Sequence, residues 1–427
     1  MANIGVIGSG PGGLHLGLFL QKHGVKSTLY SERTADELRK SKLPNTAIHW
    51  WNVRKREVEL GVDHWEGGQI GNQFWVGGLP QPLSFLGKFS AKSNIVDNRL
   101  YCATLLEDYI KRGGDVKYGA IRAEDLVGLS EKHDLVVIST GKASMTELFP
   151  RVPEYSLTEP KRRLCTGIYK GITNPQPEVL GVNLVPGMGE LYEMPFLTFD
   201  GKHTALFFFV VPGGPLEEVM NVRYEDNPKK YNETILGVVA KHFPHVRKRI
   251  DEANFGLRSA LDYLQGAITP TVRRAYAKLA NGKYVVAIGD LHAAHDPLLG
   301  QGVGCATNGA FTVGQAILDD GLAFDEMFCR RVEEQMWNNW TRDAGAWNNY
   351  MLQVPPAANT FDLIVTASKN QVLADAFADN FAAPSKNWNV MATFERSRNL
   401  LRMLGAESPM IDSALAAKAA PGAAKAT

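Results

Sequence analysis

A glycine-rich turn near the start of the chain has the residue types and spacing that bind a dinucleotide. The turn, Gly8-Ser9-Gly10-Pro11-Gly12-Gly13, follows an apolar run from Asn3 to Ile7 and precedes an apolar stretch that reaches Leu20. In a strand–turn–helix unit, the first glycine permits the turn, the second lets the backbone approach a diphosphate, and the last lets the helix pack on the strand. Free N–H groups at the helix start then bind the diphosphate. We therefore expect cofactor contacts from Gly8, Gly10, Pro11, Gly12 and Gly13.

An acidic residue follows the expected second strand, Ser27 to Tyr30, at about the interval that a ribose-binding carboxylate requires. Glu32 is this candidate, although Ser31 stands where the acid would otherwise be expected. The neighbouring Arg33 either reaches the adenine or faces water. Both Glu32 and Arg33 are predicted cofactor contacts.

A second bend with cofactor-binding chemistry lies near residue 290. Lys283 to Ile288 is typical of a buried strand, and an Ala- and Gly-rich helical stretch begins after the bend. An aspartate after a central strand can bind the hydroxyls of a flavin's ribityl chain, and N–H groups at the helix start can stabilise negative charge on its ring. The predicted contacts here are Asp290, Pro297, Gly300, Gln301 and Gly302.

Two such bends on one chain indicate a long ligand, and FAD is long enough to reach both. The alternative is a helix-capping aspartate and a flexible glycine loop, which explains each bend but not their pairing. Three further residues suit the same sheet and are predicted contacts. Thr140 and Gly141 end a buried strand, and Arg99 begins an amphipathic helix, where it either touches the cofactor or pairs with Asp97.

Composition excludes several classes of protein. The chain has 427 residues, with 46 Lys plus Arg against 45 Asp plus Glu, so its net charge of +1 predicts no nucleic-acid partner. Its hydrophobic residues, 44% of the chain, suffice for a folded core. The apolar run Ala205 to Val211 is too short for a membrane span, and we expect no membrane association and a cytoplasmic location. The four cysteines lie far apart without a CxxC pair, which indicates packed thiols.

Other catalytic chemistries lack their central device. We find no HExxH or comparable metal spacing, no GxSxG elbow and no GxxxxGK[ST] loop in the sequence. We therefore expect no metal site, and we expect the flavin to carry the reaction.

The pattern of elements predicts an α/β fold in which a Rossmann-like FAD-binding domain is interrupted by a β-sheet substrate domain. We expect the discontinuous FAD-binding domain at 1–45, 85–163 and 275–320, and the substrate domain at 46–84 and 164–274. A pocket between these domains is natural. A helical region is expected at 321–412, and the Ala-rich stretch 413–427 is expected to be a disordered tail.

Several segments together resemble the styrene and indole monooxygenases over nearly the whole chain except its tail. They are Gly8 to Leu20, Leu43 to His49, Val76-Gly77-Gly78, Val96 to Tyr101, Ala123 to Leu126, and Asp296 to Gly302. The resemblance implies a fold of the p-hydroxybenzoate hydroxylase-like type, usually as a homodimer. It also implies a two-component system: an NADH-dependent flavin reductase delivers reduced, non-covalently bound FAD. This chain then reacts with O2 and epoxidises styrene-like vinyl aromatics through a flavin C4a-hydroperoxide.

The resemblance also assigns candidate substrate contacts. Asn45, His49 and Ser93 match family positions that line the substrate cavity, and all three have the residue found in styrene-type members. Asn45 and His49 are the predicted catalytic residues, and Ser93 is a predicted pocket residue. Other predicted pocket residues are Leu43, Ala47, Gln69, Asn72 and Pro297. Ala47, Gln69 and Asn72 depart from the styrene-type pattern, which leaves the substrate preference open. Asn45 as a turn residue and His49 as a helix-surface histidine are the alternatives.

Three alternative functions remain open. The first is an indole monooxygenase, whose product leads to indigo. The second is a flavin-dependent halogenase, although the sequence has no WxWxIP segment. The third is a non-catalytic binding protein that reuses the FAD-binding fold.

Overall fold

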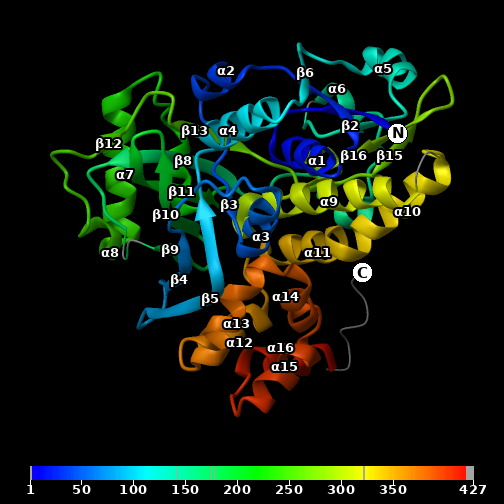
Figure 1. The fold of residues 1–427 in the computed structure, drawn as a ribbon. Coiled ribbons are helices and arrows are strands. Elements are labelled where there is room, and N and C mark those ends of the chain that lie inside the picture. Colours follow the sequence, from blue (N-terminus) through cyan, green and yellow to red (C-terminus); the bar gives the residue numbers. More distant parts are fainter. Residues whose placement is uncertain (1, 142, 175, 177, 321–322, 420–427) are drawn as a thin grey trace.

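The computed structural model describes residues 2–141, 143–174, 176, 178–320 and 323–419. Its described part contains two large sheets, helices around the first of them, and a group of helices that ends the chain (Figure 1). The predicted α/β fold is confirmed, with a six-stranded sheet from the predicted cofactor region and a nine-stranded sheet from the predicted insert.

The six-stranded sheet has the order β15-β16-β7-β1-β2-β6, and its central strands pair in parallel. Only β15 is antiparallel to its neighbour. Its strands are β1 (Asn3–Ile7), β2 (Lys26–Ser31), β6 (Asp115–Tyr118), β7 (Leu135–Ile138), β15 (Tyr276–Lys278) and β16 (Tyr284–Ala287). The carboxyl ends of β1, β7 and β16 therefore meet at one edge, where an open α/β sheet binds its ligand.

Helices cover both faces of this sheet, as a parallel sheet requires. On one face, Val137 packs with Leu16 and Val313; on the other, its neighbours Val136 and Ile138 pack with Leu129. Helices of the first face are α1 (Pro11–Lys22), α4 (Asn98–Lys111), α9 (Gly302–Asp320) and α10 (Glu326–Met336). Shorter helices nearby in the chain are α2 (Ala35–Arg39), α3 (Trp51–Leu60), α5 (Leu126–Lys132) and α6 (Ala143–Thr146).

The nine-stranded sheet has the order β12-β8-β11-β10-β9-β4-β5-β3, with β13 also paired to β8. Its strands are β3 (Ile48–His49), β4 (Gln69–Val76), β5 (Leu83–Ile95), β8 (Arg163–Lys170), β9 (Val179–Val185), β10 (Gly189–Thr198), β11 (Gly201–Val210), β12 (Gly256–Leu257) and β13 (Tyr263–Ala267). Helices α7 (Pro228–His242) and α8 (Pro244–Arg247) accompany it, and β14 (Thr271–Val272) pairs separately with β17 (Ala293–Ala294).

Side chains alternate between the two faces of this sheet, and the alternation divides its core. Phe207 and Phe209 on β11 join the cluster that includes the C-terminal helices, whereas Phe208 joins the cluster under α7. The run that predicted a buried strand therefore serves two different cores.

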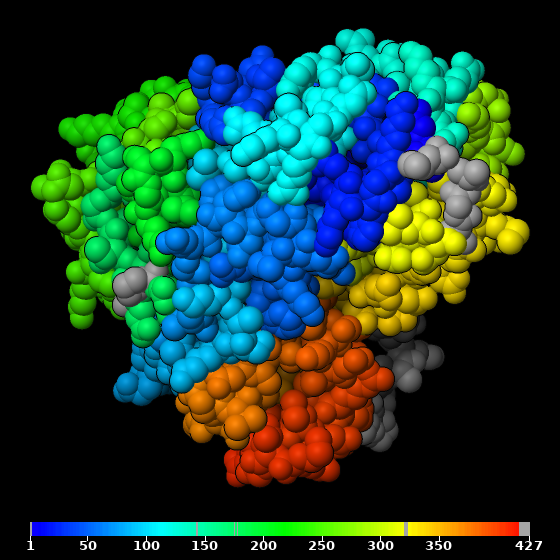
Figure 2. Space-filling model, in the orientation of Figure 1, coloured from blue at the N-terminus to red at the C-terminus, as the bar shows by residue number. Residues whose placement is uncertain are grey.

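The C-terminal helices form a lobe against the far end of β4 and β5 (Figure 2). Backbone N–H groups of Lys88 and Ser90 on β5 donate to Asp375 and Asp379, each at 2.8 Å. The lobe contains α11 (Arg342–Met351), α12 (Ala358–Ala367), α13 (Gln371–Asp379), α14 (Pro384–Met391), α15 (Phe394–Met403) and α16 (Pro409–Ala419).

Two expected boundaries differ from the structure. β5 pairs with β4 and, at its end, with β3 in the second sheet, so 85–95 lies outside the cofactor sheet to which we assigned it. The expected disordered tail is wrong for 413–419, because α16 continues through these residues, whose many alanines favour helix. Residues 420–427 lie outside the described part of the chain.

A buried cluster of charges holds the start of α4. The guanidinium of Arg99 contacts Asp97 at 2.5 Å and Asp262 at 2.6 Å, and all three side chains are almost fully buried. Its Nη1 also donates to the carbonyl of Ser41 at 3.2 Å. The cluster therefore ties the segment before Asn45 to the helix that carries Asn98.

We predict that Arg99→Ala lowers the free energy of unfolding by about 3–5 kcal/mol, because the buried Asp97 loses its cationic partner and the buried Asp262 keeps only Arg258. Urea unfolding of the flavin-free protein measures this change. As a control, Arg330→Ala removes an exposed ion pair with Glu326 and should leave the unfolding midpoint near that of the wild type. Equal effects from both variants would contradict a structural role for the buried cluster.

Candidate active site

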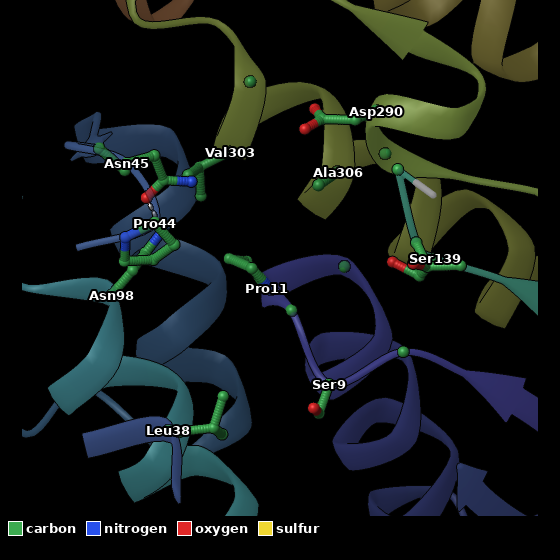
Figure 3. A pocket seen from close by; sticks show the side chains of 18 of the residues that line it. Ser9, Pro11, Leu38, Pro44, Asn45, Asn98, Ser139, Asp290, Val303 and Ala306 are labelled. Carbon is green, nitrogen blue, oxygen red and sulfur yellow. Dashed lines mark hydrogen bonds between the residues drawn. The ribbon is translucent and has the colours of Figure 1, made fainter. Parts of the chain in front are cut away.

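Both glycine bends line the same cavity, which has a volume of about 490 Å³. The first bend contributes Gly8 to Gly12, and the second contributes Asp290, Pro297, Gly300 and Gly302. Figure 3 shows Pro11 between the two sides of the cavity, with Asn45 and Asn98 on one side and Asp290 and Ser139 on the other. Segments almost 300 residues apart in the sequence thus form one binding site.

The first bend requires glycine for two different reasons. Gly8 has φ +108°, and a Cβ there would lie 2.3 Å from the carbonyl oxygen of Ser139. A Cβ on Gly13 would lie 1.9 Å from the carbonyl oxygen of Gly8, so Gly13 lets α1 pack on the turn and does not itself line the cavity. At Gly10, by contrast, a Cβ would meet no atom within 4 Å, which leaves its backbone open to a ligand.

The start of α1 is suited to bind a diphosphate. Gly10 is its N-cap and Pro11 its first residue, and no side chain caps the helix. Uncapped N–H groups and the helix dipole together favour an anion at this end. Glu32, Arg33, Thr140 and Gly141 line the same cavity, as predicted for cofactor contacts. The hydroxyl of Ser31 is instead used inside the turn, where it donates to the carbonyl of Arg33 at 2.6 Å and lies 2.7 Å from the hydroxyl of Ser9.

The second bend is shaped by Gly300, which has φ +61°. A Cβ on Gly300 would lie 2.5 Å from Ile48, and its carbonyl accepts a hydrogen bond from the indole of Trp50 at 3.0 Å. Asp290 is exposed to the cavity, yet the surrounding protein limits its hydration and raises its pKa. Burial lowers the pKa of His295, another lining residue, to about 4, so its imidazole is neutral at pH 7.

These residues fit a long dinucleotide. The uncapped helix start and the open face of Gly10 suit a diphosphate, and Asp290 can accept hydrogen bonds from hydroxyls at the other end. A Cβ on Gly302 would also meet no atom within 4 Å, so the start of α9 offers a second open approach.

A second, smaller cavity adjoins the first and is almost entirely apolar. The two cavities share Thr46, Ile48, Pro297 and Gly300. The other lining residues are Trp50, Asn72, Leu180, Val182, Tyr192, Met194, Phe207, Phe209, Leu298, Leu299 and Phe381. Both polar atoms of the Asn72 amide are buried and have no hydrogen-bond partner in the described part of the chain. A ligand is therefore the natural partner for Asn72.

The structure places the predicted substrate residues in two groups. Asn45 and Ala47 line the larger cavity, Asn72 lines the smaller one, and Pro297 lines both. Asn45 accepts a hydrogen bond from Asn98 at 2.5 Å, and its amide nitrogen lies on the side of Val303 (Figure 3).

Three of the remaining four, Leu43, Gln69 and Ser93, line neither cavity. Leu43 packs in the core, Gln69 donates to the carbonyl of Pro195, and Ser93 is fully buried. None of these three side chains borders the cavities as they stand, and their expected contact with substrate stays a prediction.

His49 is also removed from both cavities and belongs to a buried polar network. Its Nδ1 lies 2.6 Å from Glu57, which also accepts a hydrogen bond from Tyr101, and Tyr101 contacts His15 at 2.6 Å. Burial opposes the charge on Glu57, but His49 and its hydrogen bond hold the pKa of this carboxyl below its usual value. His49 is thus held by this network and lines neither cavity, and its catalytic role stays a prediction. The surface alternative is excluded, because His49 is 1% exposed.

Two predicted cofactor residues are likewise used elsewhere. Arg99 is held by Asp97 and Asp262 and does not line the cavity, which supports the ion-pair alternative. Gln301 donates to the carbonyls of Leu299 and Phe381, so it fixes the second bend from behind.

Sequence reasoning missed most of the apolar cavity and part of the cofactor cavity. The missed residues include Ser9, Thr46, Ser139, His295 and Ala306, together with Tyr192, Phe207, Phe209 and Phe381. The alternation along β10 and β11 could have assigned Tyr192, Phe207 and Phe209 to a shared side of each strand. The alternation does not indicate that the face with Tyr192, Phe207 and Phe209 meets Phe381, which lies 172 residues beyond Phe209.

The described residues hold neither a metal cluster nor a membrane-spanning helix. No group of three or more His, Cys, Asp or Glu side chains is arranged there to hold a metal ion. None of the described helices has the length and apolar character to cross a membrane. Cys102, Cys165, Cys305 and Cys329 are free and buried, as expected of packed thiols.

Solved structures with the same fold are flavoproteins. A flavoprotein/dehydrogenase from Cytophaga hutchinsonii superposes with a TM-score of 0.67 at 13% identity, covering 97% of this chain and 99% of that one. The flavin-dependent brominase Bmp2 superposes with a TM-score of 0.62 at 15% identity, covering 92% of this chain and 99% of that one. At these identities the likeness establishes the fold alone.

Relatives of higher sequence identity establish the family. A styrene monooxygenase StyA from Pseudomonas sp is 39% identical over 406 residues, or 92% of this chain and 96% of that protein. Its counterpart from Pseudomonas fluorescens is 39% identical over 402 residues, with the same coverage. Residues 141–249 match the family model described as "Styrene monooxygenase A putative substrate binding domain". The chain thus belongs to the styrene monooxygenase family of flavin-dependent monooxygenases.

Proposed function

We propose that this chain is the oxygenase component of a two-component monooxygenase that epoxidises styrene-like vinyl aromatics. The observation that supports it most is the junction of two cavities of opposite character, one with polar groups for a dinucleotide and one apolar, across four shared residues. The smaller cavity has a volume of about 30 Å³, so its side chains would have to move apart to admit an aromatic alkene, which would then lie against the end of the larger cavity.

FAD is the dinucleotide that the larger cavity fits, held without a covalent bond. Gly10, Pro11 and Gly12 would hold its diphosphate, Glu32 its ribose, and Asp290 and Gly302 its flavin half. When bound in reduced form, it supplies the O2-activating chemistry that amino acid side chains lack.

The walls of the smaller cavity position the substrate and exclude water. Phe207 and Phe209 stack with ring centroids 4.2 Å apart, and Tyr192 packs on Phe209 at 4.7 Å. The Tyr192 hydroxyl donates to the carbonyl of Leu298 at 2.8 Å, and burial raises its pKa well above 10. Its proton is therefore committed to the protein, and apolar walls keep the oxygen-transfer step away from water.

Asn72 favours indole as a second substrate. Its buried amide oxygen can accept a hydrogen bond from the indole N–H, a donor that styrene lacks. We propose that the same cavity accepts both aromatic alkenes and indole, with Asn72 affecting the balance between them.

The reductant would come from a separate NADH-dependent flavin reductase, as in the two-component systems that the sequence resembles. A homodimer and a cytoplasmic location stay predictions, and light scattering during gel filtration measures the first.

Two glycine variants test whether one cofactor spans both bends. Gly10→Ala and Gly302→Ala place a methyl group where the protein has open space, so each should weaken FAD binding about tenfold or more without unfolding the chain. Fluorescence titration with FAD measures the dissociation constant. As a matched control, Gly237→Ala lies on the exposed face of α7 with equal room and should leave binding unchanged. Weakening by only one of the two bend variants would contradict a shared cofactor.

The Asn72→Leu variant tests the proposed hydrogen bond to indole. We expect kcat/KM for indole to fall about two- to tenfold relative to styrene, which is the worth of one hydrogen bond. Indene has the shape of indole without its N–H group, so its kcat/KM relative to styrene should stay constant. Equal losses for indole and indene would mean that Asn72 acts through shape alone.

The division of labour between two proteins is tested by mixing the purified chain with NADH and FAD. We expect negligible NADH oxidation until a flavin reductase is added, and epoxide from styrene only in the complete mixture or with chemically reduced FAD. Rapid NADH consumption by the chain alone would identify a single-component hydroxylase. Halide-dependent product would instead identify a halogenase. Oxidation of reduced FAD at the rate of the free cofactor, with hydrogen peroxide as its only product, would identify a binding protein.

A further inference from the structure

A third cavity lies between the nine-stranded sheet and the C-terminal lobe. The sheet contributes Phe74, Val76, Leu184, Val185 and Tyr192, and the lobe contributes Met351, Phe361, Ile364 and Phe377. Its outer rim consists of exposed residues, Pro186, Gly187, Gln353, Val354 and Pro356. The cavity thus opens to solvent at one end and runs inward between apolar walls.

The inner end of this cavity is shared with the proposed substrate cavity. Val182, Tyr192, Leu298, Leu299 and Phe381 line both, and each is at most 8% exposed. The three cavities therefore follow one another, and the apolar one lies between the cofactor cavity and the surface beside the C-terminal lobe.

The charges along this route are paired. The guanidinium of Arg162 makes two 2.9 Å hydrogen bonds to Glu190, and its Nη1 also donates to the carbonyl of Leu352 at 3.2 Å. Because these groups are satisfied by the protein, they do not demand a charged ligand. The surfaces that remain available to a ligand are aliphatic and aromatic, which suits a neutral hydrocarbon.

A bound cofactor makes a second route necessary. Cofactor in the larger cavity would cover Thr46, Ile48, Pro297 and Gly300, which join it to the substrate cavity. An aromatic alkene that arrives afterwards must come from another side. We propose that the cavity beneath the C-terminal lobe is the passage by which neutral aromatic substrates enter and products leave.

The passage has a constriction rather than an open bore. Tyr192 is held by its hydrogen bond to Leu298, and Phe381 packs against Trp50 and Trp347 with ring centroids 5.3 and 5.1 Å away. These inner residues are tightly packed, whereas Leu184, Met351 and Phe361 nearer the rim are only half-buried. Substrate would pass when the inner side chains move apart briefly. When they close again, they would exclude water from the substrate cavity.

The test rests on the proposed function only for its choice of probe, 4-fluorostyrene, and follows probe exchange by ¹⁹F NMR with oxidised FAD bound. Leu184→Trp narrows the passage away from both other cavities and should lower the association and dissociation rates by the same factor, about tenfold, leaving Kd unchanged. In the flavin-free protein the decrease should be smaller, because the larger cavity is then open.

Two further variants complete the design. Leu236→Trp adds the same bulk at a half-buried position on α7 and should exchange the probe at the wild-type rate. Phe361→Ala widens the passage and should raise both rates severalfold, so a misfolded Leu184→Trp protein would not end the test.

The outcomes separate this inference from the proposed function. Wild-type rates in both passage variants, or a changed Kd with an unchanged association rate, would overturn the passage. Wild-type protein that binds the probe but forms no epoxide with reduced FAD would overturn the proposed reaction and leave the passage standing. Wild-type protein that binds no probe would overturn both.

Discussion

The site depends on how the segment from Pro297 to Gly302 is held between the two sheets. Trp50 donates to the carbonyl of Gly300, and Tyr192 donates to the carbonyl of Leu298. Both donors belong to the substrate side of the fold, whereas the helix that follows, α9, packs on the cofactor sheet. Only glycine allows the backbone at residue 300 to pass so close to Ile48. At Gly300, the segment between the polar and the apolar cavity therefore has backbone and no side chain.

Charge is handled in a consistent way around this junction. Arg99 with Asp97 and Asp262, His49 with Glu57, and Arg162 with Glu190 are paired inside the protein. These pairs join separate segments of chain, while the cavity walls that face a substrate remain apolar. Buried ions need such partners, because an unpaired charge near the substrate cavity would draw in water. The ion pairs thus hold the chain segments together, while other, apolar side chains exclude water from the cavity.

Motif-based expectations succeeded where the chemistry resides in the backbone. The turn from Gly8 to Gly13 and the bend near Asp290 were assigned to one ligand from local spacing, and they line one cavity. Expectations failed where they concerned side-chain direction. His49, Ser93 and Leu43 lie close in sequence or in the sheet to cavity residues, yet each is buried and lines neither cavity. A shift of one residue along an extended segment reverses the face, so proximity to a motif predicts direction poorly.

The sequence by itself determined the α/β class, the two glycine bends and the absence of a strong net charge, because these follow from local periodicity, residue type and composition. Only the tertiary structure decided which side chains meet in the apolar cavity, why Arg99 turns to Asp262, and that the C-terminal lobe borders a third cavity. These outcomes depend on contacts between residues more than 100 positions apart, such as Arg99 with Asp262 or Trp50 with Phe381. No local pattern encodes them, since packing of the whole chain selects which of several buried faces come together.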